Sequence, residues 1–377
     1  MIEERAVRGP VQPAGVTSAT RPVRVRFVGV EGGFNSVATH GHRVSRGINQ
    51  LGIPGIVAET VLVPRSTFAS HIPFWLSQQK AWAELTEDTD IIVLVKSSTF
   101  DRFHQAARAF KAFCAKRNVI LASSPADGPG ANAGDVSDTF SEDVADCVFT
   151  ASNAQYEYLC RHRDHSTVFN SGVATRPLMD AAVTIRDRVQ TVVWENPTHH
   201  DPNFNPSRVA FSRDEYAAFE NTIRDFCEQR GASLLTFGYW RDSQDDEEWQ
   251  TTLLSADIAI ECKALGRRYT NYQLQKPATK LQNYLALGLP VVCDSVPSYV
   301  EVGKHGGVLF ADSIDEWTDR LGRLFDSRQL RAELSAASRR AVASHSIAAV
   351  AADHVACFKK MLGRSTAAGH RELARQL

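Results

Sequence analysis

Short apolar runs alternate with helix-like segments along most of this chain, and the alternation occurs twice. The first set lies between Val23 and Ser152 and comprises VRVRFVGV, IVAETVLV, IIVLV, NVILAS and DCVFTAS. After a break near Arg176 a second set lies between Thr191 and Phe310 and comprises TVVWENP, SLLTFG, DIAIE, LPVVCD and GGVLF. Strands that alternate with helices form parallel sheets with helices on both faces. The sequence therefore predicts an α/β fold of two doubly wound, Rossmann-like domains that face each other across a cleft.

The length of the chain, 377 residues, allows each of these domains a core of its own. We expect a disordered lead-in over 1–21, where Pro10 and Pro13 stand among small polar residues. An N-terminal domain over 22–178 and a C-terminal domain over 187–345 follow. A helix over 346–363 and a flexible, polar tail over 364–377 complete the predicted organisation.

Composition and charge exclude several classes of protein. Hydrophobic residues make up 43% of the chain and charged residues 23%, as in globular proteins, and the formal net charge of −1 disfavours a nucleic-acid partner. The start, MIEERAVRGP, is not a signal peptide, and apolar strings such as IIVLV are too short to span a bilayer. Seven cysteines occur singly without a CxxC pair, which indicates buried free thiols. These features predict a cytoplasmic protein.

One segment, KPATKLQNYLALGLPVVCDSVPSYVEVG (Lys276 to Gly303), favours a ligand site. Its composition predicts a helix that begins at Pro277, ends at Gly288 and leads directly into a strand. The free N–H groups of that helix then lie at the carboxyl edge of the sheet, where they favour an anion. Basic residues gather around this end, which would suit a diphosphate: Lys263, Arg267, Arg268, Lys276 and Lys280. The alternative is a capped core helix with solvated lysines.

The same segment resembles the nucleotide-sugar site of GT-B glycosyltransferases, particularly the retaining family 4-like group. The sequence ALGLPVV matches the family pattern "A-x-G-x-P-V-V", ADIAI matches an upstream strand, and Glu301 matches the glutamate on which the following loop closes. In the first domain, DCVFTASNAQYEYL, STVFNSGVATRP and GVEGGFN are similar to further family segments. The resemblance extends loosely from Val23 to Leu362 and is dense from Asp257 to Gly307. It implies that Tyr299 and Glu301 belong to the donor site.

The chain departs from the family at its two characteristic acids. The family's E-x7-E glutamates hold the donor, whereas Gln275 and Asn283 stand at the matching positions. Asn283 can still exchange hydrogen bonds with a ribose, but it carries no charge. The usual arginine and lysine after the first strand of the second domain are replaced by WENPTHHDPNF. The lysines and arginines near the predicted helix start would then supply the cation for the phosphates.

The resemblance implies a glycosyltransferase that binds a nucleotide sugar on the C-terminal domain and the acceptor on the N-terminal domain. By the same likeness the reaction retains anomeric configuration and uses neither a metal nor a cofactor, and the helix over 346–363 crosses back onto the first domain. The acceptor is a surface glycan, a lipid-linked sugar or a small molecule, with peripheral membrane association as an option. The sequence leaves the oligomeric state open. Two alternatives remain: a sugar-nucleotide epimerase of the same fold, and a non-catalytic binding or scaffold protein.

Most of the other candidates lie in the first domain. By the family resemblance, Gly32 and Gly33 in GVEGG would let the donor phosphates or the acceptor approach the backbone closely. An alternative is a nicotinamide enzyme in which Glu59 accepts from the ribose, but the spacing of the glycines is not GxGxxG. His40 either reaches the cleft or is a surface histidine. Asp127 is either a cleft base or part of an Asp-Gly turn. The run His199-His200-Asp201 lacks the distant third ligand that a metal site needs.

Overall fold

The computed structural model describes residues 21–30, 41–64, 67, 75–95, 104–125, 143–175, 181–195, 212–237, 246–264, 269, 271–365 and 368–376. Four of the predicted first-domain site residues lie outside these ranges: Gly32, Gly33, His40 and Asp127. Arg267 and Arg268 of the second domain, and the run from His199 to Asp201, lie outside them as well.

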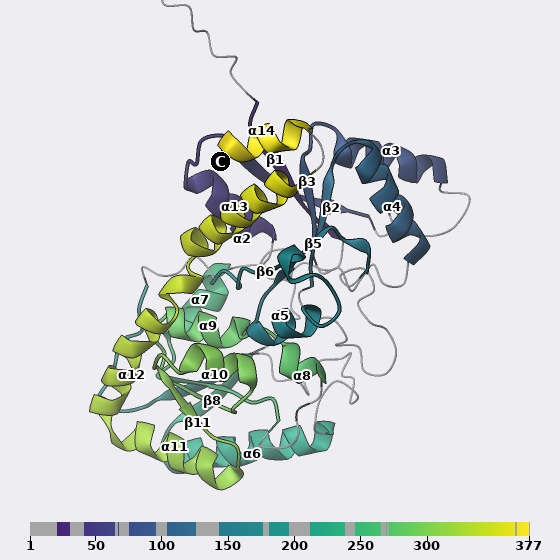
Figure 1. The fold of residues 1–377 in the computed structure, drawn as a ribbon. Helices are drawn as coiled ribbons and strands as arrows, with labels where there is room; N and C mark the ends of the chain where they lie inside the picture. Colours follow the sequence, from purple (N-terminus) through teal and green to yellow (C-terminus); the bar gives the residue numbers. More distant parts are fainter. Residues whose placement is uncertain are drawn as a thin grey trace, which may run out of the picture.

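The first half of the chain forms a parallel sheet of six strands in the order β2-β1-β3-β4-β5-β6 (Figure 1). Every pair of neighbouring strands in this sheet runs parallel, as the alternating pattern predicts. The strands are β1 Val23–Val30, β2 Ile56–Val63, β3 Ile91–Val95, β4 Ile120–Ser124, β5 Cys147–Thr150 and β6 Val168–Asn170.

Helices cover both faces of this sheet. One face packs on α2 and, from the far end of the chain, on α13 and α14, while the other packs on α3, α4 and α5. Full burial of a core side chain such as Phe27 contributes about 1.5–3 kcal/mol. The helices are α2 Arg43–Gln50, α3 Trp75–Thr86, α4 His104–Lys116, α5 Asn153–Leu159, α13 Ile347–Arg364 and α14 Ala368–Gln376, with a 3-10 turn, η7, at His165–Thr167.

The second half forms another parallel sheet, with five strands in the order β11-β10-β9-β7-β8. Its strands are β7 Thr191–Glu195, β8 Ser233–Phe237, β9 Ile258–Glu261, β10 Val291–Cys293 and β11 Val308–Phe310. Helices α7, α9 and α10 bury one face, and α6 and α11 bury the other. The helices are α6 Arg213–Gln229, α7 Asp246–Leu254, α8 Asn271–Gln275, α9 Thr279–Ala286, α10 Pro297–Gly303, α11 Ile314–Asp326 and α12 Arg328–Ala341, and η10 spans Ala343–His345. The predicted fold class is confirmed: two doubly wound α/β units.

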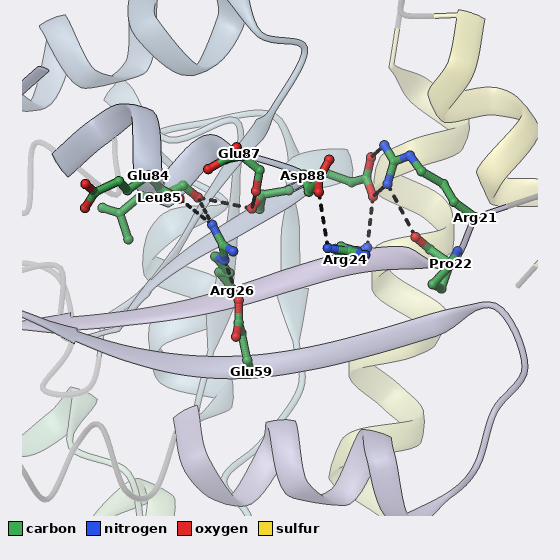
Figure 2. Close-up of polar contacts among 11 residues, drawn as sticks. Arg21, Pro22, Arg24, Arg26, Glu59, Glu84, Leu85, Glu87 and Asp88 are labelled. Atoms are coloured by element: carbon green, nitrogen blue, oxygen red, sulfur yellow. Dashed lines mark hydrogen bonds and ion pairs between the residues drawn. The ribbon is translucent and has the colours of Figure 1, made fainter. Parts of the chain in front are cut away.

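A chain of ion pairs fixes the start of the first sheet (Figure 2). The guanidinium of Arg21 donates to both carboxylate oxygens of buried Asp90, at 2.9 and 2.6 Å, and the backbone N–H of Arg24 donates to the same carboxylate at 2.9 Å. Farther along β1, Arg26 pairs with Glu59 and donates to two carbonyls at the end of α3. Glu59, the ribose acceptor of the nicotinamide alternative, is thus paired with an arginine of its own sheet.

Helix α13 joins the two halves, because it follows η10 of the second half and packs on the first sheet (Figure 1). Its first turn lies on α2 so closely that a Cβ added at Gly47 would stand 2.6 Å from the Ile347 side chain. The chain end differs from the flexible tail predicted over 364–377. Residues 368–376 form α14, and Leu373 and Ala374 are buried in the core beside α13. The apolar pair among polar residues is what holds this end in place.

The two halves meet through segments that follow the carboxyl ends of their strands. Ser152, directly after β5, donates through its hydroxyl to the carbonyl of Gln275 at 3.4 Å, and the N–H of Asn153 donates to Glu301 of α10 at 3.3 Å. Behind this contact, the N–H of Thr175 donates to the carbonyl of His345 at 2.9 Å. The sheets therefore present their carboxyl edges toward one another, as the sequence predicts.

Candidate functional site: a lysine and carboxylate cluster below helix α9

The predicted anion-binding helix is α9, and it begins two residues later than expected. Its N-cap is Ala278, which offers no side chain to the first N–H groups, so the helix starts at Thr279 and Pro277 stands before the cap. The predicted end is confirmed: Gly288 adopts a φ of +75°, and its N–H donates to the carbonyl of Leu285 at 3.0 Å. Strand β10 follows, so the start of α9 lies at the carboxyl edge of the sheet.

Three buried carboxylates lie at this edge, on neighbouring strands. Glu195 ends β7, Glu261 ends β9, and Asp294 directly follows β10. None of the three exposes more than 1% of its surface. Burying a carboxylate is costly unless cations or hydrogen-bond donors surround it. Their concentration at the edge where ligands of parallel sheets bind indicates a functional site.

Glu261 lies at the centre of the cluster and is paired with two lysines. The ammonium of Lys263 contacts its Oε1, and the ammonium of Lys280, from the first turn of α9, lies 3.6 Å from the same oxygen. The hydroxyl of Tyr299 also lies 3.3 Å from Oε1. Burial acts to raise the pKa of Glu261, but the two ammonium groups outweigh it and the pKa is lowered. Glu261 is therefore ionised at neutral pH.

Lys280 has one further partner and an altered acidity. Its ammonium donates to the backbone carbonyl of Glu195 at 2.9 Å. Burial lowers the pKa of Lys280 to about 8, and the Glu261 carboxylate opposes that shift. The Lys280 side chain remains 19% exposed, whereas Glu261 is fully buried. Part of the Lys280 side chain is therefore open to solvent, whereas the acid beneath it is not.

Asp294 holds the backbone below this cluster. Its carboxylate accepts from the N–H of Lys263 at 2.7 Å and from the N–H of Ala264. Burial raises the pKa of Asp294 to about 7, and those two N–H groups oppose the rise. The carbonyl of Lys263 accepts from the hydroxyl of Tyr216 and the amide of Gln273, both at 2.5 Å. These contacts fix the chain after β9, and with it the position of the Lys263 ammonium.

The structure brings three of the predicted donor-site residues close to Glu261. Lys280 and Tyr299 contact it directly, and Lys276 adds to the positive potential that lowers its pKa. The backbone carbonyl of Lys276 accepts from the hydroxyl of Ser298 at 2.6 Å, which ties the start of α9 to α10. Tyr299 stays protonated because burial, together with Glu261 and Asp294, raises its pKa well above the ordinary value.

The two positions where the family carries glutamates are both buried. Asn283 lies one turn after Lys280 and is 5% exposed, and Gln275 is 6% exposed. No donor contacts the side-chain oxygen of Gln275 among the residues that the structure describes. Neither amide is therefore a solvated surface group.

Glu301 lies elsewhere, at the contact between the two halves. Besides accepting from Asn153, it borders a cavity of about 270 Å³ that Asn170, His305 and His345 also line. Burial raises the pKa of Glu301, and the Asn153 N–H opposes this. The predicted role of Glu301 in donor binding stays a prediction.

Sequence reasoning missed the carboxylates of Glu195 and Glu261. A signal was present, because TVVWE and IAIE are apolar strands that each end in glutamate. Two strand-end acids in one parallel sheet meet at its carboxyl edge when the strands are neighbours, as β7 and β9 are.

Two further findings concern the described part of the chain. It contains no helix that is both long and apolar enough to cross a bilayer. All seven cysteines lie within it, and they are free thiols, buried except for the half-buried Cys160, as predicted.

Comparison with solved structures identifies the architecture. No protein-family model matches the chain, and no curated protein is similar to it in sequence. HepE of Anabaena in complex with UDP superposes with a TM-score of 0.58 at 10% identity, covering 89% of this chain and 99% of HepE. AviGT4, a glycosyltransferase involved in avilamycin A biosynthesis, gives 0.53 at 14% identity, covering 94% and 99%. OtsA without ligand gives 0.53 at 10% identity, covering 89% and 98%. The chain therefore has the GT-B fold, and its structural neighbours include glycosyltransferases.

Proposed function

We propose that this protein is a glycosyltransferase that moves a sugar from a nucleotide-sugar donor to an acceptor hydroxyl. The observation that carries the proposal is the cluster below α9, in which a partly exposed lysine stands beside a helix start without a side-chain cap, at the carboxyl edge of a GT-B sheet. Such a site suits a diphosphate, because backbone N–H groups and ammonium groups both stabilise it. HepE, which has the same fold, binds UDP and UDP-glucose.

In this proposal Lys280 and Lys276 contact the diphosphate, and Asn283 exchanges hydrogen bonds with the ribose. Catalysis comes from stabilising the charge that develops on the departing diphosphate. Retention of configuration and independence of metal follow from the family likeness. Among residues outside the described ranges, Arg267, Arg268, Gly32 and Gly33 are further candidates for donor binding, and Asp127 and His40 are candidate catalytic residues. The acceptor itself is a glycan, a lipid-linked sugar or a small molecule.

A binding and turnover experiment tests the proposal. Calorimetry with UDP, GDP, ADP and CMP identifies the base, and release of the free nucleotide from the matching sugar nucleotides is then measured with a panel of acceptors. Acceptor-dependent release is expected. Binding without release would favour the scaffold alternative, for which the neutral Gln275 and Asn283 give a reason. Interconversion of the donor sugar without an acceptor would identify an epimerase, and failure to bind any nucleotide would refute both enzymes.

A further inference from the structure

The carboxylate of Glu261 is placed to act on the lysines rather than on a ligand. Glu261 is the last residue of β9, and its side chain points to the face of the sheet that α9 and α10 cover. It exposes none of its surface. Its Oε1 takes all three contacts from Lys263, Lys280 and Tyr299, and Oε2 has no hydrogen-bond partner among the described residues. A substrate that leaves this packing intact meets Lys280 first.

Lys280 needs a counter-ion at this position. Burial lowers the pKa of an ammonium group, and an opposite charge within about 4–6 Å opposes that shift. Each element packed around Lys280 contributes a charged or titratable group: Glu195 from β7, Glu261 from β9, Lys263 and Lys276 from the loops, Tyr284 from α9 and Tyr299 from α10. Two of these groups are lysines that repel the ammonium. Of the two carboxylates, Glu261 has the larger effect on Lys280.

We infer that Glu261 is a positioning residue for the diphosphate site, which keeps Lys280 charged and holds its ammonium at the start of α9. The inference rests on the proposed function and adds a residue to it. It also accounts for the neutral amides Gln275 and Asn283, which stand where the family carries glutamates. The negative charge beside α9 comes instead from Glu261, at the end of β9. The charge acts through Lys280, so removing it should change how donor binding depends on pH.

The test compares four forms by calorimetry between pH 6 and 9: wild type, Glu261→Gln, Lys280→Ala and the double variant, with Glu333→Gln as the matched control. Glu333 is an exposed glutamate of α12 that accepts a hydrogen bond from Gln329. The probes are UDP, GDP and ADP, with inorganic pyrophosphate as a probe that needs no base recognition. In parallel, the Lys280 pKa is measured by NMR after reductive ¹³C-methylation, its signal being assigned with Lys280→Arg.

Wild-type affinity should fall as the pH rises through the Lys280 pKa of about 8. In Glu261→Gln that pKa should drop by at least one unit, so that affinity at pH 7.5 falls about threefold or more and recovers to within about twofold of wild type near pH 6. Since Glu261 acts through Lys280, the double variant should bind within about twofold of Lys280→Ala. Glu333→Gln should match wild type throughout.

Several results would overturn the inference. An unchanged Lys280 pKa in Glu261→Gln would show that Glu261 does not keep Lys280 charged. An affinity loss of equal size at every pH would indicate that Glu261 has a merely structural role. A double variant tenfold weaker than Lys280→Ala would show that Glu261 acts by another route. If wild type binds pyrophosphate but no nucleotide, the proposed function fails, and the pyrophosphate measurements still test the role of Glu261. If wild type binds neither probe, the proposed function and the inference about Glu261 both fail, whatever the lysine titration gives.

Discussion

Acid should weaken the attachment of helix α13 to the first sheet, because His354 is buried in a neutral form. His354 is 4% exposed, its ring stacks on Phe149 at a centroid distance of 4.7 Å, and its Nδ1 donates to the carbonyl of Val350 at 2.8 Å. Burial lowers its pKa from the ordinary 6.5 to about 4, against the opposing hydrogen bond to Val350. Protons therefore bind the unfolded chain in preference to the folded one.

The sign and size of the effect follow from these two pKa values. Because the folded pKa is the lower one, stability is unaffected above pH 6.5, falls between pH 6.5 and about 4, and changes no further below that. The full difference of two and a half units corresponds to about 3.4 kcal/mol, of which about 2 kcal/mol is lost by pH 5. Other groups titrate in this range as well, so the comparison must be made between variants.

Guanidinium denaturation at pH 8 and pH 5, with wild type and His354→Leu, isolates the contribution of this histidine. Wild type should lose about 2 kcal/mol more unfolding free energy than His354→Leu between the two pH values. His162→Leu, which removes an exposed histidine, should behave as wild type. Equal pH dependence in wild type and His354→Leu would refute the assignment of a neutral, buried His354.

Three further predictions concern the site and the helix that crosses between the halves. Lys280→Ala should weaken nucleoside diphosphate binding by about 1.5–3 kcal/mol in calorimetry, since it removes a charge-assisted contact, and unchanged affinity would move the phosphates elsewhere. Asn283→Ala should weaken nucleotide binding by about 1–2 kcal/mol and remove any preference for ribo- over 2′,3′-dideoxynucleotides. Asn283→Glu should also weaken nucleotide binding, because Lys280 would then stand between two buried acids; combining it with Glu261→Gln should remove that loss. Gly47→Val should lower the unfolding free energy by about 1–3 kcal/mol, because its side chain would overlap Ile347, and an unchanged denaturation midpoint would contradict this packing.

The strand and helix periodicities were sufficient to predict the two sheets. Runs such as IIVLV are buried on both faces, and only a parallel sheet with helices on each side accounts for so many of them. The chain end was harder to predict, because α14 is polar along most of its length and only Leu373 and Ala374 reach the core. Local composition there indicates a free tail, and the contact with α13 that overrides it is visible only in three dimensions.

The candidate site was predicted in part for a similar reason. Lys280 was identifiable because it stands at the start of a helix that a glycine and a proline clearly end. Its partners were not, because Glu195 and Glu261 are separated from it along the chain and meet it only where β7 and β9 end side by side. The expectation of solvated lysines, the plain alternative at the sequence level, does not fit Lys280, whose ammonium contacts a buried carboxylate.

Two groups of ion pairs among the described residues, around Asp90 and around Glu261, lie at opposite edges of their sheets and differ in how many hydrogen bonds each carboxylate accepts. At the amino end of β1 and β3, both carboxylate oxygens of Asp90 accept from Arg21, and a backbone N–H adds to them, which suits a purely structural role. At the carboxyl end of β9, Glu261 uses one oxygen for its three polar contacts with described side chains. Lys263 and Lys280 share this one oxygen, and their two positive charges repel each other beside the start of α9. An anionic group bound there would relieve the repulsion between Lys263 and Lys280, and this is the physical reason to expect a diphosphate at this edge of the sheet.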